Sequence, residues 1–111
     1  MAMTTDELRE MLDDGLKQSY YDQLPTEMLP NVYRYVIDGL QPGHFLTAVI
    51  TNNLLDAVNR ADSRNLKALG TWIKFFYNVC PSGCYGNIET MKNWMDERRS
   101  YNVSTNKNSG F

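Results

Sequence analysis

Three polar side chains lie on one stripe of a predicted helix, at a spacing that would let them bind a ligand together. Asn53, Asp56 and Arg60 are three and four residues apart, so at about 100° per residue they share one helix face. An arginine fork is planar and always charged, which suits recognition of a carboxylate or phosphate. If the stripe faces a cleft, it would bind an anion or an amide edge, with Arg64 and Asn65 nearby. Alternatively, Arg60 bonds Asp56 or a loop carbonyl and only fixes helix packing.

The single histidine and two tyrosines beside a turn are the other candidates. His44 starts a predicted helix and has no serine, cysteine or acidic partner at a recognisable spacing, which favours a capping or exposed role over general-base catalysis. Tyr77 and Tyr85 bracket a loop of small residues, where they would stack a base, seat a partner's side chain or cover the end of a bundle. Because these groups form no catalytic set, we expect a protein that is not an enzyme.

The two cysteines, Cys80 and Cys84, enclose a short Pro-Ser-Gly turn. A structural zinc site needs four ligands, and with His44 the set reaches three. The spacing also differs from the C-x-x-C of redox enzymes. The sequence therefore favours two reduced thiols, and we expect neither a metal nor another cofactor.

Composition places the chain among ordinary globular domains. Its 111 residues are 42% hydrophobic and 22% charged, which suits one domain with one modest core. No apolar run reaches the roughly 20 residues that cross a bilayer, and the acidic start lacks a signal-peptide core. We therefore expect a cytoplasmic protein that does not enter a membrane. A pI near 5.3 disfavours direct nucleic-acid binding.

Negative charge is concentrated near the start of the chain. Residues 1–30 carry seven acids and two bases, a net of −5, whereas the remainder carries a net of +3. The acids of the first helix, among them Asp13 and Asp14, would meet a basic surface on a partner or form a solvated face.

Apolar residues recur at helical spacing throughout, so the predicted fold class is all-α: a compact bundle of about five helices with a disordered C-terminal tail. The expected helices begin at about Thr5, Pro30, His44, Arg64 and Asn87, and the last three end at about Ala61, Val79 and Arg99. In domain terms, we expect a loosely docked acidic helix (1–23), a helical core domain (24–99) and a flexible tail (100–111).

A short turn joins the third and fourth predicted helices, so we expect them to pair in antiparallel fashion. That pairing would make His44 and Phe45 neighbours of the 79–81 segment. It would also keep Arg60 near Asn65 and away from Tyr85.

A set of motifs resembles a family of small tailed-phage and prophage proteins. The motifs are P-G-x-F-L-T-A-V at 42–49, Asn53-Leu54, Ala57, Arg60-Ala61-Asp62, Asn65, Ala68-Leu69, Tyr77-Asn78 and P-x-G-C-Y-G at 81–86. The resemblance covers about residues 24–96, with Tyr85 where a tryptophan is expected. The family has no established activity, so the resemblance implies a small accessory protein that acts in the cytoplasm of an infected bacterium.

The expected function is that of a non-enzymatic phage accessory protein that binds and inhibits a host protein or complex. A bacterial defence complex is the favoured target, as for an anti-CRISPR-like or other anti-defence factor. The alternative is a small-molecule or nucleotide-binding sponge that uses Arg60, Asn53 and aromatic residues. The sequence leaves the oligomeric state open, with a homodimer among the options.

Overall fold

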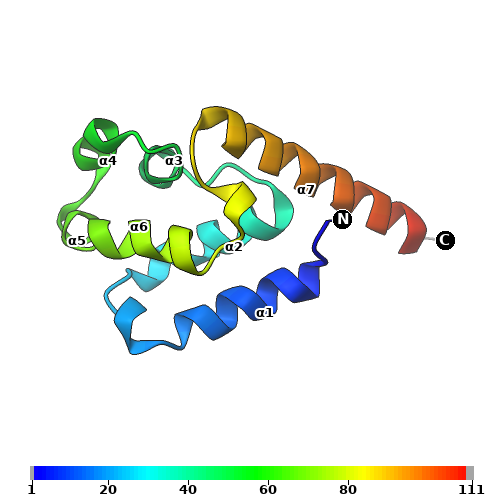
Figure 1. Cartoon of the computed structure of the whole chain (residues 1–111), viewed down its shortest axis with the longest axis horizontal. Coiled ribbons are helices and arrows are strands. Elements are labelled where there is room, and N and C mark those ends of the chain that lie inside the picture. The colour runs from blue at the N-terminus through cyan, green and yellow to red at the C-terminus, as the bar shows by residue number, and fades with distance from the viewer. Residues whose placement is uncertain (1, 110–111) are drawn as a thin grey trace.

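Helices account for 75% of the computed structural model, which describes residues 2–109 (Figure 1). In that range the chain forms seven α-helices and three short 3-10 helices: α1 (Thr5–Leu16), η1 (Ser19–Tyr21), η2 (Thr26–Met28), α2 (Leu29–Asp38), α3 (His44–Ile50), α4 (Leu54–Arg60), α5 (Ser63–Lys67), α6 (Leu69–Asn78), η3 (Ser82–Cys84) and α7 (Ile88–Ser109). The all-α prediction is confirmed, but the helices are more numerous than the five expected.

Helix ends follow the capping chemistry of the sequence. At the start of α1, Thr4 Oγ1 accepts from the Glu7 amide at 3.1 Å, and Glu7 accepts in return from the Thr4 amide. Gly39 ends α2 in the left-handed conformation, with φ of 72°. Asp62 and Asn87 each accept a hydrogen bond from the amide three residues further on, as their positions in the sequence predict.

The predicted third helix, 44–61, is divided by a turn at residues 51–53. Asn52 takes a left-handed φ of 60°, which asparagine tolerates better than most residues. Asn53 then starts α4, because its side-chain oxygen accepts from the Asp56 amide at 3.1 Å. As a result α4 folds back against α3. The expectation of one continuous helix is wrong, because asparagine side chains compete for the backbone bonds that would continue it.

This reversal also changes how the third and fourth predicted helices pair. The ring of Phe45, at the start of α3, packs edge-on against Trp72 in the first half of α6, with centroids 6.4 Å apart. Asn52, after the end of α3, instead contacts Gly86. The expectation that His44 and Phe45 neighbour the 79–81 segment is therefore wrong. The predicted helix 64–79 is itself present as α5 and α6, which meet at Ala68.

One hydrophobic core extends from α1 to α7, centred on the aromatic residues of α6. Leu8 and Leu12 of α1 are completely buried, and each contributes about 2 kcal/mol by leaving water. The structure thus packs α1 into the core instead of docking it loosely. Its narrow apolar stripe is buried at Leu8 and Leu12, and Gly15 lets the helix backbone come close to Val79.

The last helix, α7, continues to Ser109 instead of ending at Arg99, and its far end projects beyond the other helices (Figure 1). The segment expected to be a tail is therefore helical through Ser109, while its mobility stays a prediction. Residues 110 and 111 lie outside the described part of the chain. None of the described helices, α7 included, combines the length and apolar character needed to cross a membrane.

Four side chains of α7 bind the last carbonyls of α2, and we call them the α7 clamp. They are Trp94 Nε1 to Val36 O (3.1 Å), Arg98 Nε to Ile37 O (2.8 Å), Arg99 Nε to Gly39 O (3.0 Å) and Asn102 Nδ2 to Ile37 O (3.2 Å). Arg98 is 1% exposed and also donates through Nη1 to the carbonyl of Met3. The Tyr101 ring covers its guanidinium at 4.3 Å. The clamp therefore ties α7 to α2 and to the segment before α1.

Replacing Arg98 by methionine should lower the free energy of unfolding by roughly 3 kcal/mol, because Met3 O loses its side-chain donor and Ile37 O keeps only the longer bond from Asn102 Nδ2. The matched variant Arg99→Met removes a half-exposed side chain and should cost less than about 1 kcal/mol. Urea unfolding of both variants measures the difference. Equal losses in the free energy of unfolding for the two variants would contradict a larger contribution from Arg98 than from Arg99.

Two glycines on helices should respond to alanine in opposite directions. A Cβ at Gly15 would lie 2.3 Å from Val79 Cγ1, so Gly15→Ala should destabilise the fold by about 1–3 kcal/mol through overpacking. A Cβ at Gly70 would meet nothing within 4 Å, so Gly70→Ala should stabilise it by about 0.5–1 kcal/mol through helix propensity. Thermal unfolding of the two variants tests the pair, and shifts of the same sign would contradict the packing of α1.

Candidate binding groove between α4 and α6

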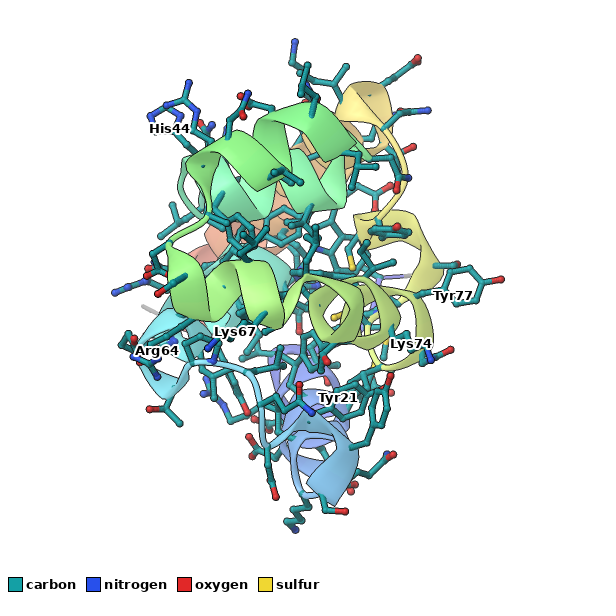
Figure 2. All side chains as sticks on the ribbon, turned by 90° about the vertical axis from the view of Figure 1, so that its left-hand side faces the viewer. Tyr21, His44, Arg64, Lys67, Lys74 and Tyr77 are labelled. Carbon is teal, nitrogen blue, oxygen red and sulfur yellow. The ribbon has the colours of Figure 1, made fainter. Side chains whose placement is uncertain are left out.

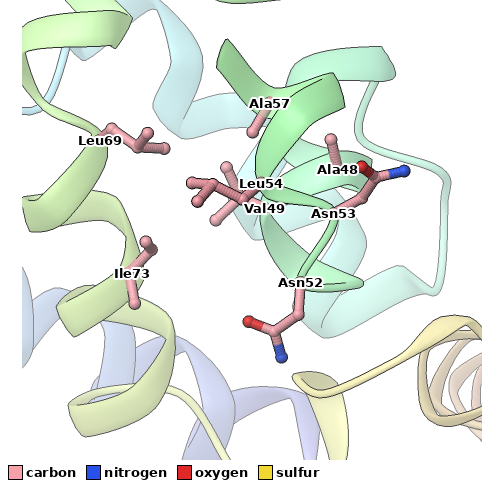
Figure 3. Close-up of a pocket in the computed structure, with 8 residues that line it drawn as sticks. All are labelled: Ala48, Val49, Asn52, Asn53, Leu54, Ala57, Leu69 and Ile73. Atoms are coloured by element: carbon pink, nitrogen blue, oxygen red, sulfur yellow. The ribbon is translucent and has the colours of Figure 1, made fainter.

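A hollow of about 190 Å³ opens between α4 and α6, and we call it the α4–α6 groove (Figure 3). Its lining consists of Ala48, Val49, Asn52, Asn53, Leu54, Ala57, Leu69 and Ile73. Figure 3 shows Leu69 and Ile73 reaching from α6 towards Leu54 and Val49. None of these eight side chains is ionisable. The groove therefore suits an apolar group, with amides at one end to orient it.

The outer surface of α4 continues this apolar character. Leu54, Leu55 and Val58 are 63%, 73% and 40% exposed, and we call them the apolar face of α4. Of the seven residues of α4, Ala57 alone is buried. A short helix held by one small buried residue, with its larger apolar side chains in water, is typical of an interaction surface.

The polar stripe predicted to bind a ligand is engaged within α4 itself. Asn53 caps the helix, and Arg60 Nε lies 3.4 Å from Asp56 Oδ1. Both side chains of this ion pair are about half-exposed, so it adds less than about 1 kcal/mol of stability. The contacts support the interpretation that Arg60 fixes its own helix.

Arg64 and Asn65 also have structural partners. Arg64 Nη1 forms an ion pair with Glu27 Oε1, which joins α5 to η2. Asn65 is buried, and its side-chain oxygen accepts from Trp72 Nε1 at 3.0 Å. Because its side-chain oxygen is bonded to the buried Trp72 indole, Asn65 holds α5 against α6 and does not face a ligand.

The two candidate acids of α1 lie apart from the groove. Asp13 accepts a hydrogen bond from the Tyr33 hydroxyl on α2, and Asp14 pairs with Lys17 at 3.6 Å. Burial and the nearby Asp13 carboxylate raise the pKa of Tyr33 above its usual value, so the phenol stays protonated and keeps this bond. Asp13 therefore connects α1 to α2 in addition to adding surface charge.

His44 and Tyr77 lie on opposite sides of the view in Figure 2, so these two candidates do not share a site. Tyr77 is 75% exposed and lines a second hollow of about 340 Å³ with Phe76, Ser82 and Tyr85. The Tyr85 ring stacks on Phe76 with centroids 6.3 Å apart and planes 6° apart. Tyr77 and Tyr85 thus line the same hollow, and whether they stack a ligand there stays a prediction.

Asn52, which sequence reasoning missed, connects the two hollows. Its Oδ1 accepts from the Tyr85 hydroxyl at 2.7 Å, and its Nδ2 donates to Gly86 O at 2.6 Å. The Gly86 amide in turn donates to Ile50 O at 2.9 Å. The Asn-Asn pair was the available signal, since asparagine often occupies a left-handed turn position.

The cysteines are structural. Cys80 and Cys84 are free and buried, and burial raises the pKa of the Cys80 thiol well above its ordinary value. A buried protonated thiol is unreactive. The carbonyl of Cys84 accepts from the Tyr35 hydroxyl at 2.7 Å, which fixes η3 to α2.

Replacing Asn52 by alanine should lower the free energy of unfolding by about 2 kcal/mol, because it removes two side-chain hydrogen bonds and strains a left-handed residue. Asn52→Gly should cost about half as much, since glycine keeps the backbone conformation. The exposed Asn59 on α4 is the control, and Asn59→Ala should change little. Urea unfolding of the three variants tests this, and equal losses for alanine and glycine at position 52 would contradict the backbone contribution.

Comparison of the chain with models of known protein families, with curated proteins and with solved structures gave no match. Its function is therefore inferred from the groove, the apolar face of α4 and the motifs of its sequence.

Proposed function

We propose that the protein is a non-enzymatic accessory protein that binds another protein through the α4–α6 groove and the apolar face of α4. The observation that carries this proposal is the exposure of Leu54, Leu55 and Val58 beside a hollow lined by groups that do not ionise. Apolar side chains gathered at one place on a surface gain free energy when a partner removes them from water. Proton transfer and nucleophilic attack need ionisable groups, and the groove lining offers none.

The class of partner comes from the motifs of the sequence. Their resemblance to tailed-phage and prophage proteins supports a partner in the infected bacterium. A small domain that covers the substrate-binding or catalytic surface of a host complex inhibits that complex without being an enzyme itself. We therefore propose a host protein or complex as the target, a bacterial defence complex first among them, and the bacterial cytoplasm as the place of action.

A second candidate function is binding of a nucleotide or another ring-bearing small molecule, and the hollow beside Tyr77 favours it. Tyr77 and Tyr85 present aromatic surface there, on which a base could stack. Arg60 and Asn53, which were expected to share such a ligand, are engaged within α4. The aromatic residues alone support this function, which makes it the weaker of the two.

A pull-down from bacterial lysate tests the first function. The wild-type chain should retain one host protein in stoichiometric amount, and Leu55→Glu/Val58→Glu should lose it, because two charges on the apolar face oppose desolvation. The matched control Ile88→Glu/Val103→Glu also changes exposed apolar residues and should retain the partner. All three proteins should melt within a few degrees of one another, since every altered side chain is exposed.

Equal retention by the α4 variant and the wild type would contradict the assignment of this surface. Retention of no protein, together with a nucleotide released by heat denaturation, would support the second function instead.

A further inference from the structure

We propose that the partner contributes an acidic amphipathic helix, which lies along α6 in the α4–α6 groove. This inference rests on the proposed function, namely that a protein binds here. It adds the secondary structure, the position and the charge of the segment that binds.

The first support is an apolar stripe along α5 and α6, which we call the α6 stripe. Leu69, Ile73 and Tyr77 recur every four residues along α6, and Leu66 of α5 comes before the turn at Ala68 that precedes them. Leu66 and Tyr77 are exposed, while Leu69 and Ile73 are partly buried and line the groove. A stripe of this period that faces outward is what a second helix packs against, with anchors at the same spacing.

The second support is Gly70, which lies on the exposed side of α6 between the ends of the stripe. Glycine weakens a helix relative to alanine, and a close approach by another group is one reason for its presence. At Gly15 the close neighbour is Val79, since a Cβ there would lie 2.3 Å from Val79 Cγ1. A Cβ at Gly70 would meet nothing within 4 Å. The fold of the chain itself therefore does not require glycine at position 70. A partner helix that crosses α6 at this point would use the space.

The third support is a row of bases along the other side of α5 and α6. Arg64, Lys67 and Lys74 lie along one side of these helices in Figure 2. Gly70 and Lys74 are four residues apart and therefore share a face of α6, while Arg64 and Lys67 belong to α5. Arg64 pairs with Glu27, and the Lys74 ammonium lies over the Tyr20 ring at 5.3 Å. A helix with its apolar side on the stripe would meet this row, and acidic residues there would be attracted to it.

The chain itself does not supply the helix. Its acidic helix, α1, has the right charge, but Leu8 and Leu12 of its apolar side are completely buried in the core of the same chain. A second copy would have to unfold to offer them. With α1 excluded, we assign the occupant to a different protein.

Site-specific photo-crosslinking in bacterial cells tests the position and the nature of this segment. A benzophenone amino acid replaces Leu66 or Tyr77 on the α6 stripe, Leu55 on α4, or Val103 on α7 as the control. Mass spectrometry then identifies the crosslinked peptide. We expect the two stripe positions to capture one partner segment that has a net negative charge and apolar residues at i, i+3 or i+4, and i+7, and we expect no capture from position 103.

The outcomes separate this inference from the proposed function. Capture from Leu55 but from neither stripe position, or capture of a basic or non-amphipathic segment, would overturn the acidic helix and leave the proposed function in place. Absence of a captured protein from all of the α4 and stripe positions would overturn both.

A synthetic peptide of the captured segment then measures the contribution of each feature in fluorescence polarisation with the full chain. Lys67→Glu/Lys74→Glu should weaken binding about tenfold or more, and added salt should weaken binding to the wild type. Gly70→Leu should also weaken it about tenfold, because its side chain fills the space for the partner backbone. Lys92→Glu changes an exposed base on α7 and is the matched control.

Circular dichroism melting should show that these variants stay folded, since a side chain at Gly70 enters open space. Unchanged affinity of the charge-reversed variant would contradict an acidic partner. Unchanged affinity of Gly70→Leu would contradict a helix that crosses α6 closely.

Discussion

The hydrogen bonds of the buried Arg98 guanidinium hold α7, α2 and the segment before α1 together, and the rest of the fold depends on them. The last carbonyls of an α-helix have no partner within that helix and carry partial negative charge, so a cation is the favoured group to meet them. Arg98 meets the end of α2 at Ile37 O and holds the segment before α1 at Met3 O. Burial lowers the pKa of its guanidinium, which nevertheless stays charged because arginine begins so far above physiological pH.

The position of the groove follows from α2 through a chain of hydrogen bonds. With α2 fixed by the α7 clamp, the Tyr35 hydroxyl holds η3 at the Cys84 carbonyl. The next residue, Tyr85, binds Asn52, and Asn52 sets the turn that folds α4 back on α3. The α4–α6 groove thus depends on contacts made at the opposite end of the fold. Its lining comes from residues 48–73 and is mostly apolar, but its shape also depends on polar groups as far along the chain as Tyr85 and α7.

Local chemistry made part of this fold predictable. Gly39, Asp62 and Asn87 act within a few residues of their own positions, so the ends that they mark could be read from the sequence. The turn at Asn52 had only the Asn52-Asn53 pair as a local signal, because an apolar period of 3.6 continues through it and its partner Gly86 is 34 residues away. Likewise, the polar segment after Arg99 has no apolar period of its own, and α7 extends through it with Asn102 bonded to α2.

The candidate site was predictable to a similar extent. Sequence spacing offered pairing of Asp56 with Arg60 as one of two interpretations, and the structure has that pair. It gave no sign of the groove, because Leu69 and Ile73 face Leu54 across a gap between helices. A hollow between two elements depends on how they are placed, and a single sequence records the period of each element but not their separation.

The sequence distance across the α7 clamp has a consequence for the synthesis of the chain. Met3 and Arg98 are 95 residues apart, so the ribosome makes the first long before the second. Until Arg98 and Asn102 have been added, the end of α2 stays hydrated and the buried leucines of α1 have no finished core to enter. The nascent chain therefore exposes apolar surface for most of its synthesis, which is a substrate for chaperones. Because one core joins α1 to α7, the chain should reach its native state in one cooperative step and not helix by helix.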